Sequence, residues 1–132
     1  SQLEIVSELN GKGSRTEGAK VADDMINAHE DLVGIFAIND PSGLGAYSSV
    51  EKAGRQDQVT VIGFDGSPDG KQGVFEKKLY DTPQQFPRQM AEMTVEMFLK
   101  HVQGEAIEKS HIIPCTHYYY EDAQKDENRD SF

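Results

Sequence analysis

Residues 33–54 read VGIFAINDPSGLGAYSSVEKAG, and this stretch decides the fold class. Its first six residues are continuously apolar, which is typical of a short β-strand that is covered on both faces of its sheet. Asp40 can cap the helix that follows, because Pro41 suits the first helical turn and Gly54 suits the position just past the last one. The stretch therefore predicts a buried strand that leads directly into a helix.

The same strand-then-helix unit recurs on both sides of this stretch. Residues 59–64, VTVIGF, predict a second buried strand, with Ser67 as the cap of the next helix. Upstream, LEIVSEL at residues 3–9 predicts another strand, and a helix is expected from Ser14 as far as His29. Because parallel strands need crossover helices, this alternation predicts an α/β fold with three layers and a mostly parallel, doubly wound sheet.

The pattern continues less regularly in the second half of the chain. A short strand is expected over residues 78–82. Pro87 is expected to open the longest helix, and Gly104 is expected to stop it. The apolar residues of that helix, from Met90 to Phe98, recur at helical spacing and are assigned to the core.

Length, charge and cysteine content exclude several classes of protein. The chain has 132 residues, a net charge of −10 and one cysteine, Cys115. One cysteine cannot build a disulfide framework, and the negative charge opposes sequence-independent binding to nucleic acid or to an anionic membrane. No apolar run approaches the roughly 20 residues of a membrane helix. We expect one lobe over residues 1–120 and an acidic, mobile tail over residues 121–132.

Each predicted strand is followed by a neutral amide or a carboxylate, and none by a basic residue. The candidate binding residues are Asn10, Asn39, Asp65 and Gln85. Ligands of open α/β sheets bind at the carboxyl ends of the strands, so these side chains are expected to share one rim. Such groups suit a neutral polyhydroxylated ligand, although the same residue types are common in turns and caps. Asn39 is expected to be free for a ligand because Asp40 provides the cap.

Three runs of the sequence together resemble a known family. They are GIFAINDPSGLGAYSSVEKAGR (34–55), VTVIGFDGSPDG (59–70) and YDTPQQFPRQMAE (80–92). In this order and spacing they closely resemble the C-terminal lobe of ribose-type periplasmic sugar-binding proteins, the solute receptors of ABC importers. The likeness extends over residues 3–120.

The resemblance implies a periplasmic, two-lobed receptor that closes on a monosaccharide, catalyses no reaction and serves a membrane permease. It implies that Asn39 and Asp65 contact sugar hydroxyls and that Gln85 is a polar contact near the hinge. No cofactor and no metal belong to this expectation. Gly13 departs from the pattern, because many members of the family have an aromatic ring there.

A second departure is that the chain begins after the strand and helix that normally open this lobe. A missing N-terminal lobe is expected as well. In a 2-1-3-4-5 strand order, the absent strand would lie between residues 3–9 and residues 33–38. We expect either that these two segments pair directly or that a second copy supplies an edge in a homodimer, because unpaired strand edges invite association.

Other interpretations remain beside this one. The effector-binding lobe of a lactose-repressor-type transcription regulator has the same fold and a similar signature, and it is the alternative function. Asp65, Asp69 and Glu76 approach the spacing of a calcium loop, but a strand precedes them where an EF-hand requires a helix. Cys115 and His117 lack the further ligands and the pair spacing of a zinc site. The sequence contains no Walker loop, GxGxxG or GxSxG motif of an enzyme.

Overall fold

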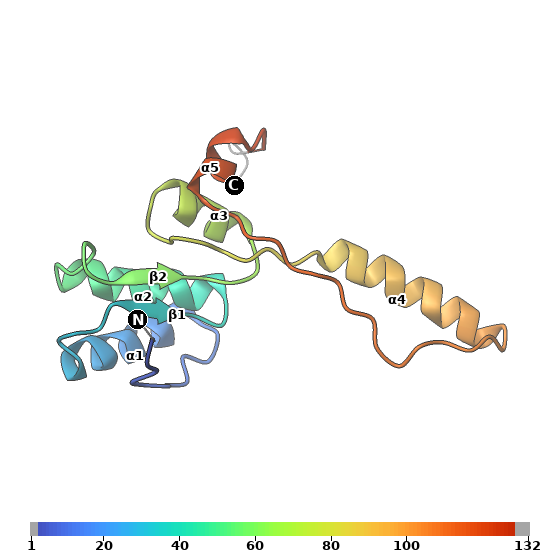
Figure 1. Ribbon diagram of the computed structural model, residues 1–132, viewed down its shortest axis with the longest axis horizontal. Helices are drawn as coiled ribbons and strands as arrows, with labels where there is room; N and C mark the ends of the chain where they lie inside the picture. Colours follow the sequence, from blue (N-terminus) through green and yellow to red (C-terminus); the bar gives the residue numbers. More distant parts are fainter. Residues whose placement is uncertain (1–2, 129–132) are drawn as a thin grey trace.

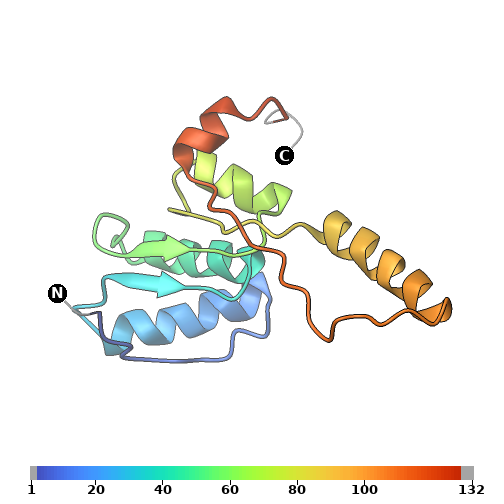
Figure 2. The ribbon, with the colours of Figure 1, turned by 45° about the vertical axis from the view of Figure 1, so that its right-hand side comes forward.

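The structure is a computed structural model, and it describes residues 3–128 of the chain. Its elements, in chain order, are α1 (Arg15–Ala28), β1 (Gly34–Phe36), α2 (Asp40–Lys52), β2 (Thr60–Ile62), α3 (Pro68–Phe75), α4 (Pro87–Val102) and α5 (Tyr120–Lys125). Figures 1 and 2 show the strands with α1 and α2 in one body, α3 and α5 beside it, and α4 reaching away from it.

The sheet is parallel. β1 and β2 pair in parallel along their whole length. The segment expected as a strand at residues 78–82 continues the sheet beside β2, and an isolated parallel bridge joins Asp65 to Gln84 farther along. The chain later returns through an antiparallel bridge between Gln84 and Thr116. The predicted α/β class with a mostly parallel sheet is therefore confirmed, although the regular strands are shorter than predicted.

One face of the sheet carries the core. The inward residues of the three neighbouring strand segments are all buried: Ile35, Val61 and Leu79. α2 contacts both strands, and α1 packs on α2. The residues that alternate with them lie on the other face and are largely exposed: Phe36 (66%), Ile38 (72%) and Tyr80 (63%). The strands are predicted to be buried on both faces, but only their inner face is buried.

Residues 3–9 do not form the predicted strand. They pair with no other described segment, and Leu3 and Ile5 are 88% and 78% exposed. The expected direct pairing of this segment with β1 is therefore wrong. An alternating pattern favours extended backbone, but a strand also needs a neighbour that shares its hydrogen bonds. The other expectation, an edge supplied by a second copy, stays a prediction.

Helix ends follow the predicted capping chemistry at three places. The Ser14 hydroxyl oxygen accepts from the backbone N–H of Glu17 at 3.2 Å, and α1 begins directly after Ser14. The Ser67 hydroxyl oxygen accepts from the backbone N–H of Gly70 at 3.1 Å at the start of α3. α4 begins at Pro87 and ends before Gly104, whose φ is +79°.

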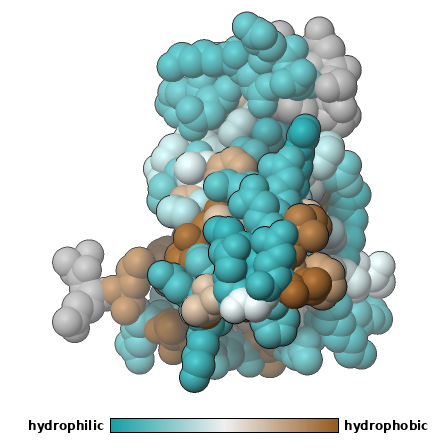
Figure 3. All heavy atoms as spheres, turned by 90° about the vertical axis from the view of Figure 1, so that its right-hand side faces the viewer, coloured by the Kyte–Doolittle hydropathy of each residue, from teal (hydrophilic) through white to brown (hydrophobic). Residues whose placement is uncertain are grey.

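The core assignment of α4 is wrong within the described chain. None of the residues of α4 is buried, and Val95, Phe98 and Leu99 are each more than half exposed. Its amphipathic pattern indicates a face that needs cover, but the pattern does not say which element provides it. α4 makes no extensive contact with another described element. Figure 3 looks at the molecule from this side and shows apolar atoms, in brown, at the surface.

Residues 121–125 of the predicted tail belong to the short helix α5 (Tyr120–Lys125), and the mobility of the tail stays a prediction. α5 packs on α3, and Ala123 is completely buried. The acidic composition concealed this contact because one alanine supplies the buried side chain. The aromatic ring of Tyr120 also stacks on Phe75, with 6.3 Å between the ring centroids. Residues 129–132 of the predicted tail lie outside the described residues.

Candidate functional site

Asn39 lies just past the end of β1 and caps α2. Its Oδ1 accepts from the backbone N–H of Ser42 at 3.0 Å, and its Nδ2 donates to the carbonyl oxygen of Gly13 at 3.0 Å. The prediction that Asp40 provides the cap and leaves Asn39 free is therefore wrong. Asn39 is the last residue with extended backbone (φ −156°, ψ 166°), whereas Asp40 is already helical. The Asn39 amide still has a second N–H and a second lone pair for a ligand.

Asp65 and Gln85 are brought into direct contact, although 20 residues separate them. Nε2 of Gln85 donates to Oδ1 of Asp65 at 2.6 Å, and the backbone N–H of Gln85 donates to the carbonyl oxygen of Asp65 at 2.9 Å. Both side chains are half-buried. Within residues 3–128, Oδ2 of Asp65 and Oε1 of Gln85 have no hydrogen-bond partner. These two oxygens can accept hydrogen bonds from hydroxyl groups of a ligand.

Asn39, Asp65 and Gln85 occupy one rim of the sheet. Asn39 follows the last residue of β1 by three positions, and Asp65 follows the last residue of β2 by three positions. Because β1 and β2 are paired in parallel, their carboxyl ends meet at one edge, and the Asp65–Gln84 bridge brings the third segment to the same edge. The arrangement matches the expected rim, and the binding role of its residues stays a prediction.

Asn10 is separate from the other three candidates. It is exposed, and its Oδ1 accepts from the backbone N–H of Lys12 at 2.9 Å in a local turn. No described hydrogen bond joins it to Asn39, Asp65 or Gln85. The structure therefore gives Asn10 a turn role, and it assembles the rim from the other three residues.

Two residues of this edge, Asp40 and Thr82, have no assigned site role in the sequence analysis. Both are completely buried, and the Thr82 hydroxyl donates to Oδ1 of Asp40 at 2.6 Å. The sequence signal for Asp40 is ambiguous, because an acid after Asn39 and before Pro41 is equally typical of an exposed helix cap. Nothing in the local pattern distinguishes a buried acid from a solvated one.

No basic side chain hydrogen-bonds to Asn39, Asp65 or Gln85 among the residues that the structure describes. Their groups are one carboxyl group and two amides. A phosphate or carboxylate ligand would need a cationic partner, whereas sugar hydroxyls need acceptors together with amide donors. The chemistry of the rim therefore suits a neutral, hydroxyl-rich ligand.

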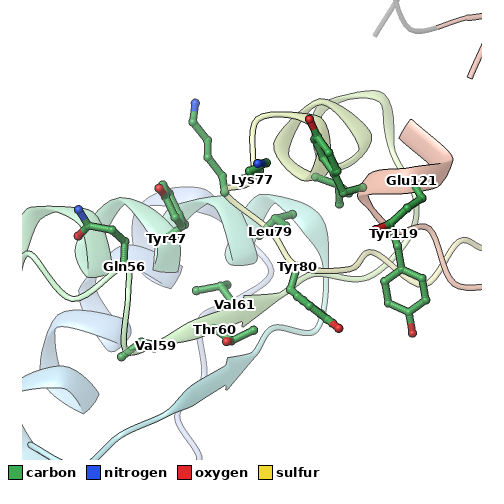
Figure 4. Close-up of a pocket in the computed structure, with 13 residues that line it drawn as sticks. Tyr47, Gln56, Val59, Thr60, Val61, Lys77, Leu79, Tyr80, Tyr119 and Glu121 are labelled. Carbon is green, nitrogen blue, oxygen red and sulfur yellow. The ribbon is translucent and has the colours of Figure 1, made fainter. Parts of the chain in front are cut away.

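One cavity of the structure lies apart from this rim. It has a volume of about 470 Å³ and is lined by tyrosines and lysines that include Tyr80, Tyr119 and Lys77. Figure 4 shows it beside the start of β2, with Val59 and Thr60 on its wall. This is the amino-terminal end of the strands, opposite the rim. We assign the site to the rim because polar side chains that follow three neighbouring strand segments converge there. The walls of the cavity do not bring such a set of side chains together.

Among residues 3–128, no group of three or more His, Cys, Asp or Glu side chains is arranged to hold a metal ion. None of the helices in this range is both long enough and apolar enough to cross a membrane.

A family comparison now bears on this geometry. The periplasmic binding protein domain matches residues 1–106. The chain belongs to this family. The match includes both strands, the first four helices and all three residues of the rim.

Curated relatives and solved structures agree with this assignment. The ribose import binding protein of Salmonella typhimurium is 40% identical over 94 residues, which cover 71% of this chain and 31% of the relative. The D-ribose/D-allose-binding protein of Pseudomonas aeruginosa is 35% identical over 106 residues, which cover 80% of this chain and 33% of the relative. The crystal structure of an ABC transporter periplasmic solute binding protein from Actinobacillus succinogenes, with bound D-allose, has a TM-score of 0.84 at 26% identity. It covers 93% of this chain and 44% of that chain.

The chain spans about a third of the length of these curated relatives, at 31% and 33%.

Proposed function

We propose that this chain forms one half of the sugar-binding site of a non-catalytic solute receptor of an ABC-type importer. The observation that carries the proposal is the Asp65–Gln85 pair on the same rim as Asn39. The pair leaves one oxygen on each side chain to accept from sugar hydroxyls, and the Asn39 amide can donate and accept. The names of the relatives specify ribose and allose, which supports a monosaccharide as the ligand.

A second lobe would complete the site. The three rim residues are half-buried, and a ligand bound to them alone would keep its far side in water. α4 gives independent evidence for a second lobe, because its apolar residues are exposed: Val95, Phe98, Leu99 and Val102. An N-terminal lobe that packs on this face of α4 would cover them and would place its own polar groups opposite the rim.

Two crossing segments would form the hinge between the lobes. The chain leaves the sheet near Gln84 toward α4 and returns at Thr116, where the two backbones exchange hydrogen bonds of 2.7 and 3.3 Å. Asp81 and His117 join the same two segments, with 2.5 Å between Oδ2 and Nδ1. Gln85 lies beside this crossing, so closure of a second lobe would act on the residue that holds Asp65.

The remaining parts of the proposal follow from the family. Receptors of this kind bind their sugar without changing it, reside in the periplasm and pass the sugar to a membrane permease. The relatives named above are transport receptors, and the comparisons give no support to the transcription-regulator alternative.

The test is calorimetric titration of D-ribose and D-allose into the two-lobed receptor. Hydrogen bonds to a charged group contribute about 1.5–3 kcal/mol, so Asp65→Ala is expected to weaken binding by roughly 10-fold to 100-fold. Asp57→Ala is the matched control, because Asp57 is exposed in the loop before β2, at the opposite end of the strands. It should leave the affinity unchanged.

The isolated chain provides a second comparison. It should bind either sugar far more weakly than the two-lobed receptor, because half of the contacts are absent. Equal affinity of Asp65→Ala and the unsubstituted receptor would refute the role of Asp65. Micromolar binding by the isolated chain would refute the two-lobed site.

A further inference from the structure

Asp40 is a buried acid whose carboxyl group accepts three hydrogen bonds. Its side chain is completely buried. Oδ2 accepts from the backbone N–H of Ser67 at 2.8 Å and from the Ser67 hydroxyl at 2.7 Å. Oδ1 accepts from the Thr82 hydroxyl at 2.6 Å. Ser67 follows β2, and Thr82 is the last residue of the segment 78–82 beside β2, so Asp40 connects the exit of β1 to the two neighbouring segments.

The side chains of Thr82 and Ser67 also hydrogen-bond to the backbone that follows Asp65. The Thr82 hydroxyl oxygen accepts from the backbone N–H of Gly66 at 3.0 Å, and the Ser67 hydroxyl oxygen accepts from the backbone N–H of Gly70. The backbone amides of both residues that follow Asp65 are therefore fixed by Asp40, one directly and one through Thr82.

The backbone of Asp65 needs such support. Its φ is +116°, in a region that residues with a side chain rarely adopt. On the amino-terminal side, the Asp65 N–H donates to the carbonyl oxygen of Pro83 at 3.0 Å. On the other side, the Gly66 and Ser67 amides are held through Asp40. An unfavourable backbone conformation persists only where its surroundings enforce it. Here hydrogen bonds hold the backbone on both sides of Asp65.

Two glycines of the GFDGSPDG run make room for the same carboxylate. A β-carbon at Gly63 or at Gly70 would overlap the side chain of Asp40. Gly63 precedes Asp65 by two positions, and Gly70 lies in α3, where glycine has no conformational advantage. These glycines fit the buried carboxylate rather than a turn.

Helix capping does not explain Asp40. Asn39 already caps α2, so the helix does not require the Asp40 side chain. Asp40 lies in the first turn of α2 and contacts Ser67, the N-cap residue of α3, so its carboxyl group lies at two helix N-termini. Backbone N–H groups without partners inside the helix lie there, and this environment suits an acceptor that organises the donors around it.

We propose that Asp40 is a positioning residue that holds the loop of Asp65 in the conformation that presents the Asp65 carboxyl group to the ligand. The sugar part of this inference rests on the proposed function, whereas the control of the loop does not. Asp40 touches no ligand in this account, and it acts through Thr82, Gly66 and Ser67.

The first test is amide hydrogen exchange of the 132-residue chain, followed residue by residue by NMR. In Asp40→Asn, an amide N–H₂ replaces one acceptor oxygen, so the donors of Ser67 and Thr82 cannot both be satisfied. The Gly66 and Ser67 amides are expected to exchange at least tenfold faster, relative to the amide of Ala22 in α1. Thr82→Val, which removes one hydroxyl at constant shape, should release Gly66 specifically, and Thr82→Ser should restore it.

A merely structural role predicts a different result. Exchange would then rise by the same factor at Gly66, Ser67 and Ala22, because only global unfolding would be easier, and that result would overturn the proposal. Should Asp40→Asn fail to fold, the Thr82→Val and Thr82→Ser pair decides by the same criterion.

The second test is the affinity of the two-lobed receptor for D-ribose. Asp40→Asn is expected to weaken binding at least tenfold while the protein remains folded. Faster loop exchange with unchanged affinity would overturn the positioning role. If the unsubstituted receptor binds neither D-ribose nor D-allose, the proposed function fails, whereas the exchange result still decides whether Asp40 holds the loop.

Discussion

At Gly70, the contact with Asp40 outweighs the preference of a helix for alanine over glycine. It lies in α3, where alanine is favoured over glycine by about 1 kcal/mol. A β-carbon at Gly70 would overlap the carboxyl group of Asp40, which three hydrogen bonds hold in place. We therefore expect Gly70→Ala to lower the free energy of unfolding by about 1–3 kcal/mol in urea titrations followed by circular dichroism.

Gly54→Ala separates this overlap from a backbone effect. Gly54 has a φ of +68° and open space around its α-carbon, so alanine there meets conformational strain alone, about 1 kcal/mol. A Gly70→Ala chain that is more stable than the unsubstituted one would mean that helix preference decides the position and that Asp40 can move aside.

For single residues, the position on the rim could be predicted from the sequence, whereas the capping role of Asn39 and the burial of Asp40 could not. Asp65 and Gln85 follow strands that turn out to be neighbours, so their shared rim could be predicted from strand order alone. Asn39 and Asp40 are both good caps, and only the backbone conformation at Asn39 decides between them. The burial of Asp40 depends on Ser67 and Thr82, which lie 27 and 42 residues away and which no local pattern connects to it.

At the scale of elements, α4 is predicted correctly in its bounds and wrongly in its surroundings. The exposed fraction of Phe98 is 63%, so Phe98→Ala should change the free energy of unfolding of the isolated chain by less than about 0.5 kcal/mol. Leu79→Ala, at a position only 2% exposed, should cost about 2–5 kcal/mol. Chemical denaturation of both variants measures the contrast.

The same substitution acts differently if a second lobe covers α4. In the two-lobed receptor, Phe98→Ala is expected to cost at least about 2 kcal/mol. An equal, small effect in both proteins would show that nothing packs on this face of α4. Residues 3–9 illustrate the same limit, because their strand pattern is present but no described segment pairs with them.

Tyr118 and Asp126, which flank α5, introduce a pH dependence of stability at alkaline pH. Burial raises the pKa of Tyr118 above its usual value, and the hydrogen bond from its hydroxyl to Asp126, 2.9 Å long, raises it further. The folded chain therefore keeps a proton on Tyr118 that the unfolded chain loses above about pH 10. Stability is unaffected by this group below that pH and falls above it, by up to about 1.4 kcal/mol per pH unit.

The measurement is the free energy of unfolding between pH 8 and pH 11.5, compared with Tyr118→Phe. The variant loses the Asp126 hydrogen bond at every pH, but its stability should decline less steeply above pH 10. Parallel curves for the two proteins would show that the Tyr118 hydroxyl titrates equally in the folded and unfolded states.

At the scale of the whole molecule, the proposed second lobe would account for both the exposed apolar surfaces and the half-buried rim. The outer face of the sheet exposes Phe36, Ile38 and Tyr80, and α4 exposes a second apolar surface. The rim residues Asn39, Asp65 and Gln85 are only half-buried. A chain that matches about a third of its relatives, at 31% and 33% of their lengths, would leave such surfaces for the remainder to cover.

A crystal structure of the two-lobed receptor with the sugar that calorimetry selects would locate the binding site. We expect side-chain atoms of Asn39, Asp65 and Gln85 within about 3.2 Å of sugar oxygens, with the ring held between the two lobes. A sugar bound at the amino-terminal end of the strands, beside Tyr80 and Tyr119, would contradict this expectation.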